Sequence, residues 1–236
     1  MFEKYFLATT IAFLVGFSST CLSGRINKSM KRLFPLFLRL DGRRCLVVGA
    51  GTIGEGKISG LLESGPAIRV VAPKATERVQ QWARAGRIRW LRREFRDSDL
   101  DGCICVVAAT SSNKLHRRIF RQARQRGVLC NVVDVPELCD FYYPAVVRRG
   151  ALQIAISTSG ESPALAQRLR KQLERKFGPE YAAWVKQLGT SRRKLNASSA
   201  DAEVKKSKLH AMVNEKSFQQ FRGQLRKARP RSKEPR

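Results

Sequence analysis

Short apolar runs alternate with amphipathic segments between residues 44 and 133. Runs without polar positions are typical of strands buried on both faces of a parallel sheet. We expect such strands at residues 45–48, 68–71, 88–91, 103–108 and 129–133. The segments between them predict helices at 53–64, 76–84 and 113–126, the last with Leu115, Ile119 and Ala123 at helical spacing. This alternation predicts an α/β fold with a Rossmann-like parallel sheet and crossover helices.

The pattern changes after residue 141. Two short apolar segments, 142–147 and 152–157, flank Arg148-Arg149-Gly150 and predict a β-hairpin. Ser162 provides a helix cap and Pro163 suits the first helical position, so a helix is expected over 162–177. A further helix is expected over 180–188. The polar, basic remainder of the chain is compatible either with more helices or with a disordered tail.

The most specific motif lies at the end of the first predicted strand. Gly49-Ala50-Gly51-Thr52-Ile53-Gly54 has the spacing G-x-G-x-x-G and leads into a predicted helix. In such a turn the first glycine makes the bend, the second lets the backbone approach a pyrophosphate, and the third lets the helix pack closely. The helix N-terminus offers N–H groups to that phosphate. The motif predicts a bound dinucleotide, with a purely structural turn as the alternative.

The residues after the second predicted strand do not identify which dinucleotide binds. Many such domains carry an acidic residue after this strand, which binds the ribose hydroxyls. Here the chain reads Val71-Ala72-Pro73-Lys74, without an acid. Lys74 would suit a 2′-phosphate, so the residues alone leave both NAD and NADP open.

The chain is strongly basic, with 46 Lys and Arg against 19 Asp and Glu and a formal net charge of +27. Such an excess favours an anionic partner, which could be nucleic acid, a membrane surface or a polyanionic small molecule, although a solvated surface is the simpler interpretation. No recognised nucleic-acid motif is present, so we expect no nucleic-acid partner.

The cysteines indicate a reducing compartment. Cys45, Cys103, Cys105 and Cys130 lie in or beside apolar segments, and the chain has no C-x-x-C motif or zinc-ligand spacing. We expect these thiols to pack as small apolar groups in a cytoplasmic protein.

The first 29 residues are apolar between Tyr5 and Phe17, which is short for a membrane span. They resemble the apolar part of a signal peptide but lack a clear cleavage site. We favour a translation start at Met30, and a membrane anchor is the second interpretation.

Several segments, in order, resemble one family, the precorrin-2 dehydrogenase / sirohydrochlorin ferrochelatase family, which is also the N-terminal half of sirohaem synthases. They are Pro35-Leu36-Phe37 with Leu40 and Gly42-Arg43, residues 47–53 with Lys57, Val107-Ala108-Ala109-Thr110, Asn131-Val132-Val133-Asp134 with Pro136, Cys139, Phe141 and Pro144, and residues 157–166 with 168–170. The resemblance covers residues 33–190.

This resemblance implies a Rossmann domain, a small dimerisation region and a helical C-terminal region. It implies NAD-dependent oxidation of precorrin-2 to sirohydrochlorin, with insertion of ferrous iron as a second activity in some members. A basic protein suits precorrin-2, because lysine and arginine steer and hold a polycarboxylate. The family lacks the acid after strand two, which favours NAD. A homodimer is implied in the same way.

Asp134 is the expected catalytic residue. It follows the fifth predicted strand, at the sheet edge where open α/β folds bind ligands, and it matches the aspartate of the family motif. Its carboxylate could accept a proton or assist iron entry. The alternative is a structural role in the turn that contains Val135 and Pro136.

The remaining candidates fall into two groups. The expected cofactor-binding residues are Gly49, Gly51, Thr52, Ile53, Pro73, Lys74, Ala109 and Thr110. The expected substrate-binding residues are Asn131, Ser157, Thr158, Ser159 and Gly160. For the last four, an equal alternative is that they only shape the start of the following helix. We expect a surface or capping role for His116, and packing against the hairpin rather than macrocycle stacking for Tyr142 and Tyr143.

The expected division of the chain has five parts. They are an N-terminal extension (1–29), the NAD-binding Rossmann domain (30–141), a dimerisation and substrate region (142–178), a helical C-terminal region (179–225) and a basic tail (226–236). The alternative function is a non-enzymatic NAD-sensing regulatory module.

Overall fold

The computed structural model describes residues 33–228. The expectations for residues 1–29 and for the end of the basic tail lie outside the described residues. From Pro35 onward, the chain forms one compact unit. No helix within residues 33–228 is long and apolar enough to cross a membrane. The cytoplasmic location stays a prediction.

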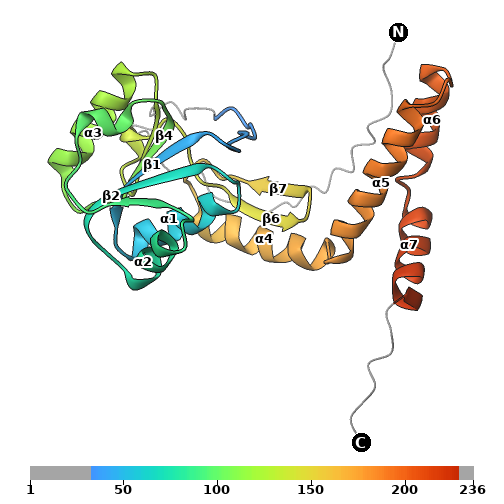
Figure 1. The fold of residues 1–236 in the computed structure, drawn as a ribbon. Coiled ribbons are helices and arrows are strands. Elements are labelled where there is room, and N and C mark those ends of the chain that lie inside the picture. The colour runs from blue at the N-terminus through green and yellow to red at the C-terminus, as the bar shows by residue number, and fades with distance from the viewer. Residues whose placement is uncertain (1–32, 229–236) are drawn as a thin grey trace, which may run out of the picture. The chain divides into compact units, whose positions relative to one another are not determined.

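The centre of the fold is a five-stranded sheet in the order β3-β2-β1-β4-β5 (Figure 1). All neighbouring strands pair in parallel, as the apolar runs predicted. The strands are β1 (Arg44–Ala50), β2 (Ala67–Ala75), β3 (Arg89–Leu91), β4 (Cys103–Ala108) and β5 (Leu129–Val132).

Helices cover both faces of this sheet (Figure 1). On one face, α1 (Thr52–Leu62) and α2 (Glu77–Arg84) pack Ile58, Val79 and Trp82 against alternate residues of β1 and β2. On the other face, α3 (Asn113–Gln125) and the 3-10 helix η1 (Asp97–Leu100) cover the residues of opposite parity. Two apolar layers therefore enclose the strands, which confirms the predicted α/β class.

The thiols lie where the apolar runs placed them. Cys45, Cys103, Cys105 and Cys130 are all buried, and the Sγ atoms of Cys45 and Cys105 on neighbouring strands are 3.4 Å apart. They pack as small apolar groups, and burial raises the pKa of Cys103 and Cys130.

The predicted hairpin is present but begins later than expected. The antiparallel strands are β6 (Ala145–Arg149) and β7 (Leu152–Ile156). The strand does not extend back to residue 142, because Pro144 has no N–H to donate to a ladder. Helix α4 (Pro163–Lys176) packs on β6, and the hydroxyl of Ser162 caps it by accepting from Leu165 N, as predicted.

The C-terminal region is helical and more extensive than the expected segment 180–188. It comprises α5 (Glu180–Asn196), α6 (Ala202–Ala211) and α7 (Glu215–Ala228). Tyr181 and Trp184 of α5 contact the ring of Phe218 of α7, at centroid distances of 4.4 and 4.7 Å. These aromatic contacts join the two helices and resolve the open choice between helix and tail in favour of helix.

The surface or capping role expected for His116 is wrong. Its side chain is buried in the α3 face of the core, and neither ring nitrogen has a hydrogen-bond partner. It shares the buried stripe of α3 with Ile119 and Ala123, at spacings of three and seven residues. That spacing follows the helix period, so the backbone geometry buries the imidazole.

One buried ion pair secures the loop between β3 and β4. The carboxylate of Asp99 accepts from both terminal nitrogens of Arg93 at 2.7 and 2.8 Å, and from the backbone N–H of Arg96 at 2.8 Å. Burial alone would raise the pKa of Asp99, but these donors outweigh it, so the pKa lies below its ordinary value.

This arrangement predicts acid sensitivity. A carboxyl group whose pKa is lowered by folding stabilises the native state above its unfolded pKa of about 3.9, and that stabilisation is lost as the pH falls through the folded value. Asp99→Asn should lower the free energy of unfolding at neutral pH by about 2 kcal/mol and flatten its fall below about pH 4.

Urea unfolding between pH 7 and pH 3 measures both effects. The matched control is Asp97→Asn, since Asp97 forms an exposed ion pair with Arg118 and should contribute less than about 1 kcal/mol. Equal losses in the two variants would contradict the assignment.

Candidate functional site

The carboxyl edge of the sheet is built around the turn after β1. Gly49 has φ of +99°, and a Cβ placed on it would lie 2.1 Å from the carbonyl oxygen of Ala109. A Cβ on Gly54 would likewise lie 2.3 Å from the carbonyl oxygen of Gly49. Only glycine fits at both positions, so the turn brings β1, α1 and the end of β4 into close contact, as the motif predicted.

The middle glycine of the motif faces open space. A Cβ on Gly51 would meet no atom within 4 Å, and no side chain caps the first N–H groups of α1. Beside it, Ile53 is 55% exposed, which is unusual for a large apolar side chain. A helix N-terminus with free donors, an open approach and an apolar neighbour fits the pyrophosphate of a dinucleotide.

The other expected cofactor residues lie on the strands that flank this turn. Pro73 and Lys74 are exposed near the end of β2, on one side of β1. Ala109 and Thr110 follow β4 on the other side, where Ala109 N donates to Val48 O at 2.8 Å. The sheet therefore brings the expected cofactor-binding residues to one edge, at the point where the strand order reverses.

Asp134 lies at the end of β5, next to β4 at the same edge. It is exposed and has φ of +61°, in the left-handed region that few residues other than glycine adopt. The thiol of Cys139 donates to the carbonyls of Val132 and Val135 at 3.1 and 3.4 Å, which ties the two sides of this turn together. The fold holds a carboxylate in a strained conformation, and such strain clusters at functional sites.

Lys57 of α1 is the residue that the expected set omitted. Burial lowers the pKa of its amine, and the negative charge of Asp134 partly opposes that shift. Its Nζ atom lies 4.1 Å from the ring centroid of Tyr143. Its place in the family motif was the available signal, since the predicted helix carries it to the same end of the sheet.

Asn131 lies deeper than a substrate contact would require. Its side chain is buried, and its amide donates to the carbonyl oxygen of Phe141 at 2.8 Å. A buried amide with this partner anchors the segment that follows the Asp134 turn. The geometry therefore gives Asn131 a supporting position behind the Asp134 turn, and its expected contact with the substrate stays a prediction.

The serine-rich loop 157–160 joins β7 to α4. The hydroxyl of Ser157 accepts from Ser159 N at 3.1 Å, and that of Thr158 accepts from Ser162 N at 3.2 Å. Ser159 has φ of +53° and is exposed, like Gly160. Two of the hydroxyl groups thus shape the loop, which leaves the Ser159 hydroxyl and the surrounding backbone as its external polar groups.

The hairpin register brings this loop toward the sheet edge. Ala145 pairs with Ile156, so residues 157–160 continue beside the segment 141–144. Within that segment Tyr143 packs on Phe141, at a centroid distance of 5.7 Å, and contacts Lys57. The hydroxyl of Tyr142 donates to Pro136 O at 3.2 Å, and the expected packing of both tyrosines against the hairpin stays a prediction.

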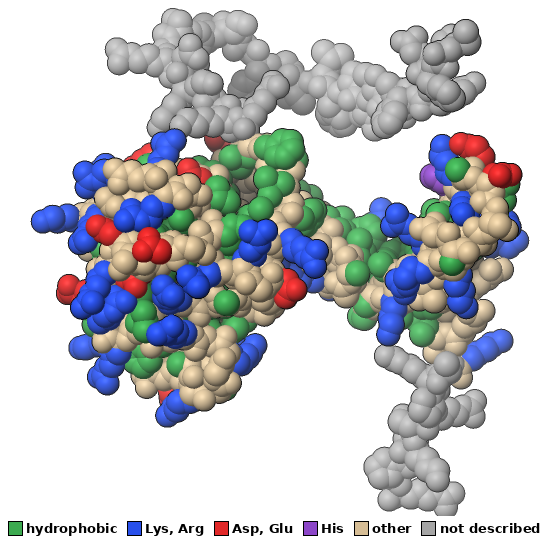
Figure 2. All heavy atoms as spheres, turned by 45° about the horizontal axis from the view of Figure 1, so that its top comes forward, with side chains coloured by type: hydrophobic (Ala, Val, Ile, Leu, Met, Phe, Trp, Pro, Cys, Tyr) green, Lys and Arg blue, Asp and Glu red, His purple; other side chains and the backbone are tan. Residues whose placement is uncertain are grey.

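Three groups of different chemistry lie at the carboxyl edge of the sheet. They are a cradle for a dinucleotide phosphate, a carboxylate that can accept a proton, and a lysine with a lowered pKa. Lysine and arginine side chains also cover much of the visible surface, with few acidic side chains between them (Figure 2). This combination suits hydride and proton removal from an anionic substrate.

Two family models match the chain. The first is described as "Putative NAD(P)-binding" and matches residues 36–145, and the second is described as "Sirohaem biosynthesis protein central" and matches residues 149–176. The first match contains the glycine turn and Asp134, and the second contains the serine-rich loop.

Curated relatives are consistent with these two family matches. The chain is 40% identical over 140 residues to a siroheme synthase of Nitrosococcus oceani, which covers 59% of this chain and 30% of that protein. It is 34% identical over 193 residues to a siroheme synthase of Photorhabdus laumondii, which covers 81% of this chain and 39% of that protein. The chain thus spans about a third of the length of the curated relatives.

A solved structure extends the similarity to the whole fold. "SirC, precorrin-2 dehydrogenase" superposes with a TM-score of 0.67 at 27% identity, covering 83% of this chain and 100% of that one. Together, the two family models, the curated relatives and this structure show that the chain belongs to the precorrin-2 dehydrogenase / sirohydrochlorin ferrochelatase family.

Proposed function

We propose that the chain oxidises precorrin-2 to sirohydrochlorin, with NAD as the hydride acceptor. The observation that supports this most directly is that the open glycine cradle and Asp134, whose backbone is left-handed, lie at the same edge of the sheet. The structural similarity to a protein named precorrin-2 dehydrogenase, which covers 83% of this chain and 100% of that one, supports this reaction class.

When bound, NAD supplies the hydride-accepting chemistry. The turn at Gly49 and Gly51 and the first N–H groups of α1 hold the pyrophosphate, and Ile53 shields it from water. Ala109 and Thr110 on one side and Pro73 and Lys74 on the other complete the cofactor-binding set. Since the cradle accepts a phosphate only where no Cβ intrudes, the residues present fit this cofactor.

The carboxylate of Asp134 accepts the proton that leaves the substrate as the hydride departs. Lys57 lies close enough for the charge of Asp134 to act on its amine, and its positive charge attracts a substrate carboxylate. Ser159, Gly160 and the backbone of the loop made by Ser157 and Thr158 contact the remaining carboxylates, and Asn131 supports the Asp134 turn. Ferrous iron is proposed as a second substrate of the same site. Its insertion displaces two protons from the pyrrole nitrogens, of which Asp134 accepts one and solvent the other.

Incubation of the protein with precorrin-2 and NAD tests the proposal by absorbance. A sirohydrochlorin spectrum that requires NAD is expected, and a further change with ferrous iron above the enzyme-free rate would add the chelatase step. Absence of sirohydrochlorin from protein that binds NAD would overturn the proposed reaction.

The proposed domain roles follow the same division as the sequence. Residues 30–141 bind NAD, residues 142–178 contribute to substrate binding and dimerisation, and residues 179–225 form the helical region. Two observations support a homodimer: the 17 residues of α5 include no fully buried side chain, and Leu165 on α4 is 46% exposed.

A homodimer predicts a measurable change in mass. The native protein should sediment as a dimer, and Leu165→Glu should lower the apparent mass toward that of one chain, because a charge in an apolar interface is costly. Gln167→Glu, at an exposed position of the same helix, is the control. A native protein that sediments as a monomer would remove the dimer from the proposal.

The cradle predicts different effects at its first and second glycines. Gly51→Ala should weaken NAD binding at least roughly tenfold while changing the free energy of unfolding by less than about 1 kcal/mol, because its Cβ enters open space near the phosphate. Gly49→Ala should instead destabilise the fold, because its Cβ collides with Ala109. Calorimetric titration with NAD and urea unfolding separate the two.

Gly60→Ala provides the matched control. This glycine lies in α1 away from the turn, and its Cβ would meet no atom within 4 Å. It should leave NAD affinity unchanged and stabilise the helix by up to about 1 kcal/mol. Equal NAD binding by the Gly51→Ala variant and the native protein would contradict the cradle.

The proton-accepting role predicts that Asp134→Asn lowers kcat for precorrin-2 oxidation by roughly 10² to 10⁴-fold. Asparagine matches aspartate in shape and tolerates the left-handed conformation, so stability and NAD affinity should be retained. Glu137→Gln, at an exposed position three residues further on, should retain full activity. Steady-state kinetics measure this effect, and an unfolding curve shows whether each variant is folded. An Asp134→Asn variant with native kcat would exclude the role.

A further inference from the structure

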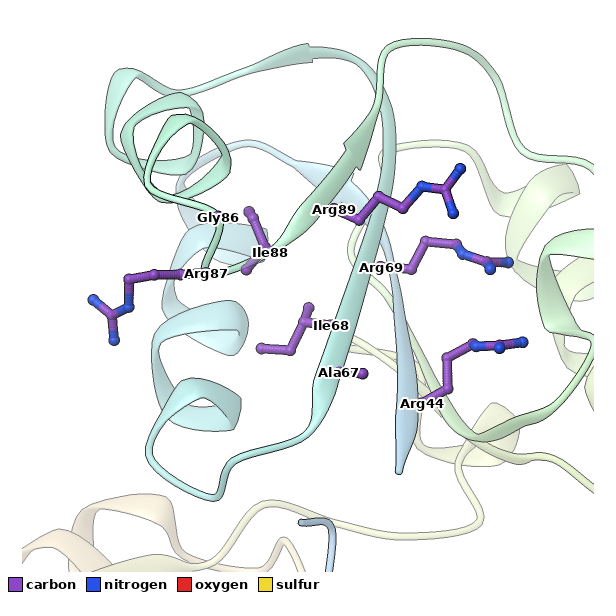
Figure 3. Close-up of a pocket in the computed structure, with 8 residues that line it drawn as sticks. All are labelled: Arg44, Ala67, Ile68, Arg69, Gly86, Arg87, Ile88 and Arg89. Atoms are coloured by element: carbon purple, nitrogen blue, oxygen red, sulfur yellow. The ribbon is translucent and has the colours of Figure 1, made fainter. Parts of the chain in front are cut away.

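A cavity lies at the end of the sheet opposite to the glycine turn. It has a volume of about 350 Å³ and is formed by the amino-terminal ends of β1, β2 and β3 with the turn that precedes β3 (Figure 3). Its lining residues are Arg44, Ala67, Ile68, Arg69, Gly86, Arg87, Ile88 and Arg89. Four of the eight residues are arginines, and the proposed NAD-dependent reaction uses none of them.

Strand register places three of these arginines in a row. Arg69 of β2 is the direct partner of Arg89 of β3, and it pairs on its other side with Leu46 of β1. Arg44 precedes Leu46 by two residues and therefore shares its face of the sheet. Figure 3 shows the side chains of Arg44, Arg69 and Arg89 extending to the same side, whereas Arg87 extends to the other.

The row concentrates positive charge. Neighbouring strands lie about 4.8 Å apart, so Arg69 and Arg89 stand directly opposite each other, and like charges in that position destabilise a sheet. No ion pair to Arg44, Arg69, Arg87 or Arg89 is found among residues 33–228. The charge of Asp99 acts on Arg69 without a direct ion pair, so carboxylates of the described residues offset the repulsion along the row only in part.

The two nearby carboxylates are engaged elsewhere. Asp99 is held by Arg93 at 2.7 Å, and Asp101 accepts from Arg126 at 3.3 Å. Their backbone carbonyls alone reach the row: Asp101 O accepts from Arg44 at 2.9 Å and Asp99 O from Arg69 at 3.5 Å. These bonds orient two guanidinium groups and leave most of their donors free, since each guanidinium carries five N–H groups.

We propose that this row is a binding site for a small oxyanion with two or more negative charges, in the chemical class of diphosphates and polycarboxylates. Guanidinium groups bind phosphate and carboxylate oxygens in pairs, and three of them on one sheet face match several oxygens of one ligand. The volume is that of a small-molecule site. An anion between Arg69 and Arg89 also removes the repulsion that the register imposes.

The site is separate from the glycine cradle. The two sites lie at opposite ends of β1, and a strand of seven residues is about 20 Å long. A ligand here cannot touch the bound dinucleotide, so it binds independently of whether the proposed reaction occurs.

Calorimetric titration with inorganic pyrophosphate, at constant ionic strength and with NAD present in excess, tests the proposal. One site is expected, and Arg69→Gln and Arg89→Gln should each weaken it by roughly ten- to hundredfold, the loss of charge-assisted hydrogen bonds. Arg89 is exposed, and its side chain makes no hydrogen bond to any residue within 33–228, so its variant should fold even if Arg69→Gln does not. Arg121→Gln, at an exposed position on α3, should bind like the native protein.

A parallel titration with citrate distinguishes the two ligand sources. Tighter binding of pyrophosphate assigns the site to phosphate-bearing ligands, and tighter binding of citrate assigns it to polycarboxylates, provided that Arg89→Gln weakens the binding. The proposal is overturned if neither anion binds, or if the Arg89→Gln variant with a native unfolding curve binds them as the native protein does. Failure of the precorrin-2 assay would leave this result unaffected.

Discussion

The backbone contact between Gly49 and Ala109 is the constraint on which the rest of the site depends. Any side chain at Gly49 would collide with the Ala109 carbonyl, so the end of β1 can approach the end of β4 only through glycine. Two backbone hydrogen bonds continue the sheet beyond the ends of β4 and β5. Ala109 N donates to Val48 O at 2.8 Å, and Val133 N donates to Ala108 O at 3.0 Å. The cradle and the Asp134 turn thus share one rigid edge, and precise placement of both groups follows from a single contact.

The division of labour across this edge is chemical as well as geometric. The cradle uses backbone N–H groups, whose partial charges are fixed by the helix and do not depend on pH. The opposite side uses Asp134 and Lys57, whose charges act on each other. In the proposed reaction, backbone N–H groups hold the pyrophosphate of the cofactor, whereas Lys57, a side chain whose charge depends on pH, attracts the polyanionic substrate.

Much of this was readable from the sequence, because local patterns determined it. The glycine spacing predicted the cradle, and the apolar runs predicted all five strands of the sheet. The position of Asp134 followed from the strand before it, although its left-handed conformation did not, since that depends on the thiol of Cys139 and on the Asn131 amide. The environment of His116 was predicted wrongly. Its spacing from Ile119 and Ala123 fits the buried stripe of α3, but a polar side chain suggests a surface position. The arginine row was beyond reach, as it depends on the register between β1, β2 and β3, which composition does not specify.

The two outer strands of the sheet also decide how the protein can meet copies of itself. β3 has only three residues and carries Arg89, and a short, charged strand is a poor template for a further strand. At the other side, the backbone of Cys130 in β5 is already engaged, since Asp140 N donates to Cys130 O at 2.7 Å and the Asp140 carboxylate accepts from Cys130 N. Sheet extension is thus blocked at both margins, which protects a strand-rich, parallel fold from aggregation while its slow pairing proceeds. Any self-association is left to the hairpin and helices beyond residue 142. Among the described residues β6 and β7 pair only with each other, so each keeps one open edge that can pair with a strand of a partner.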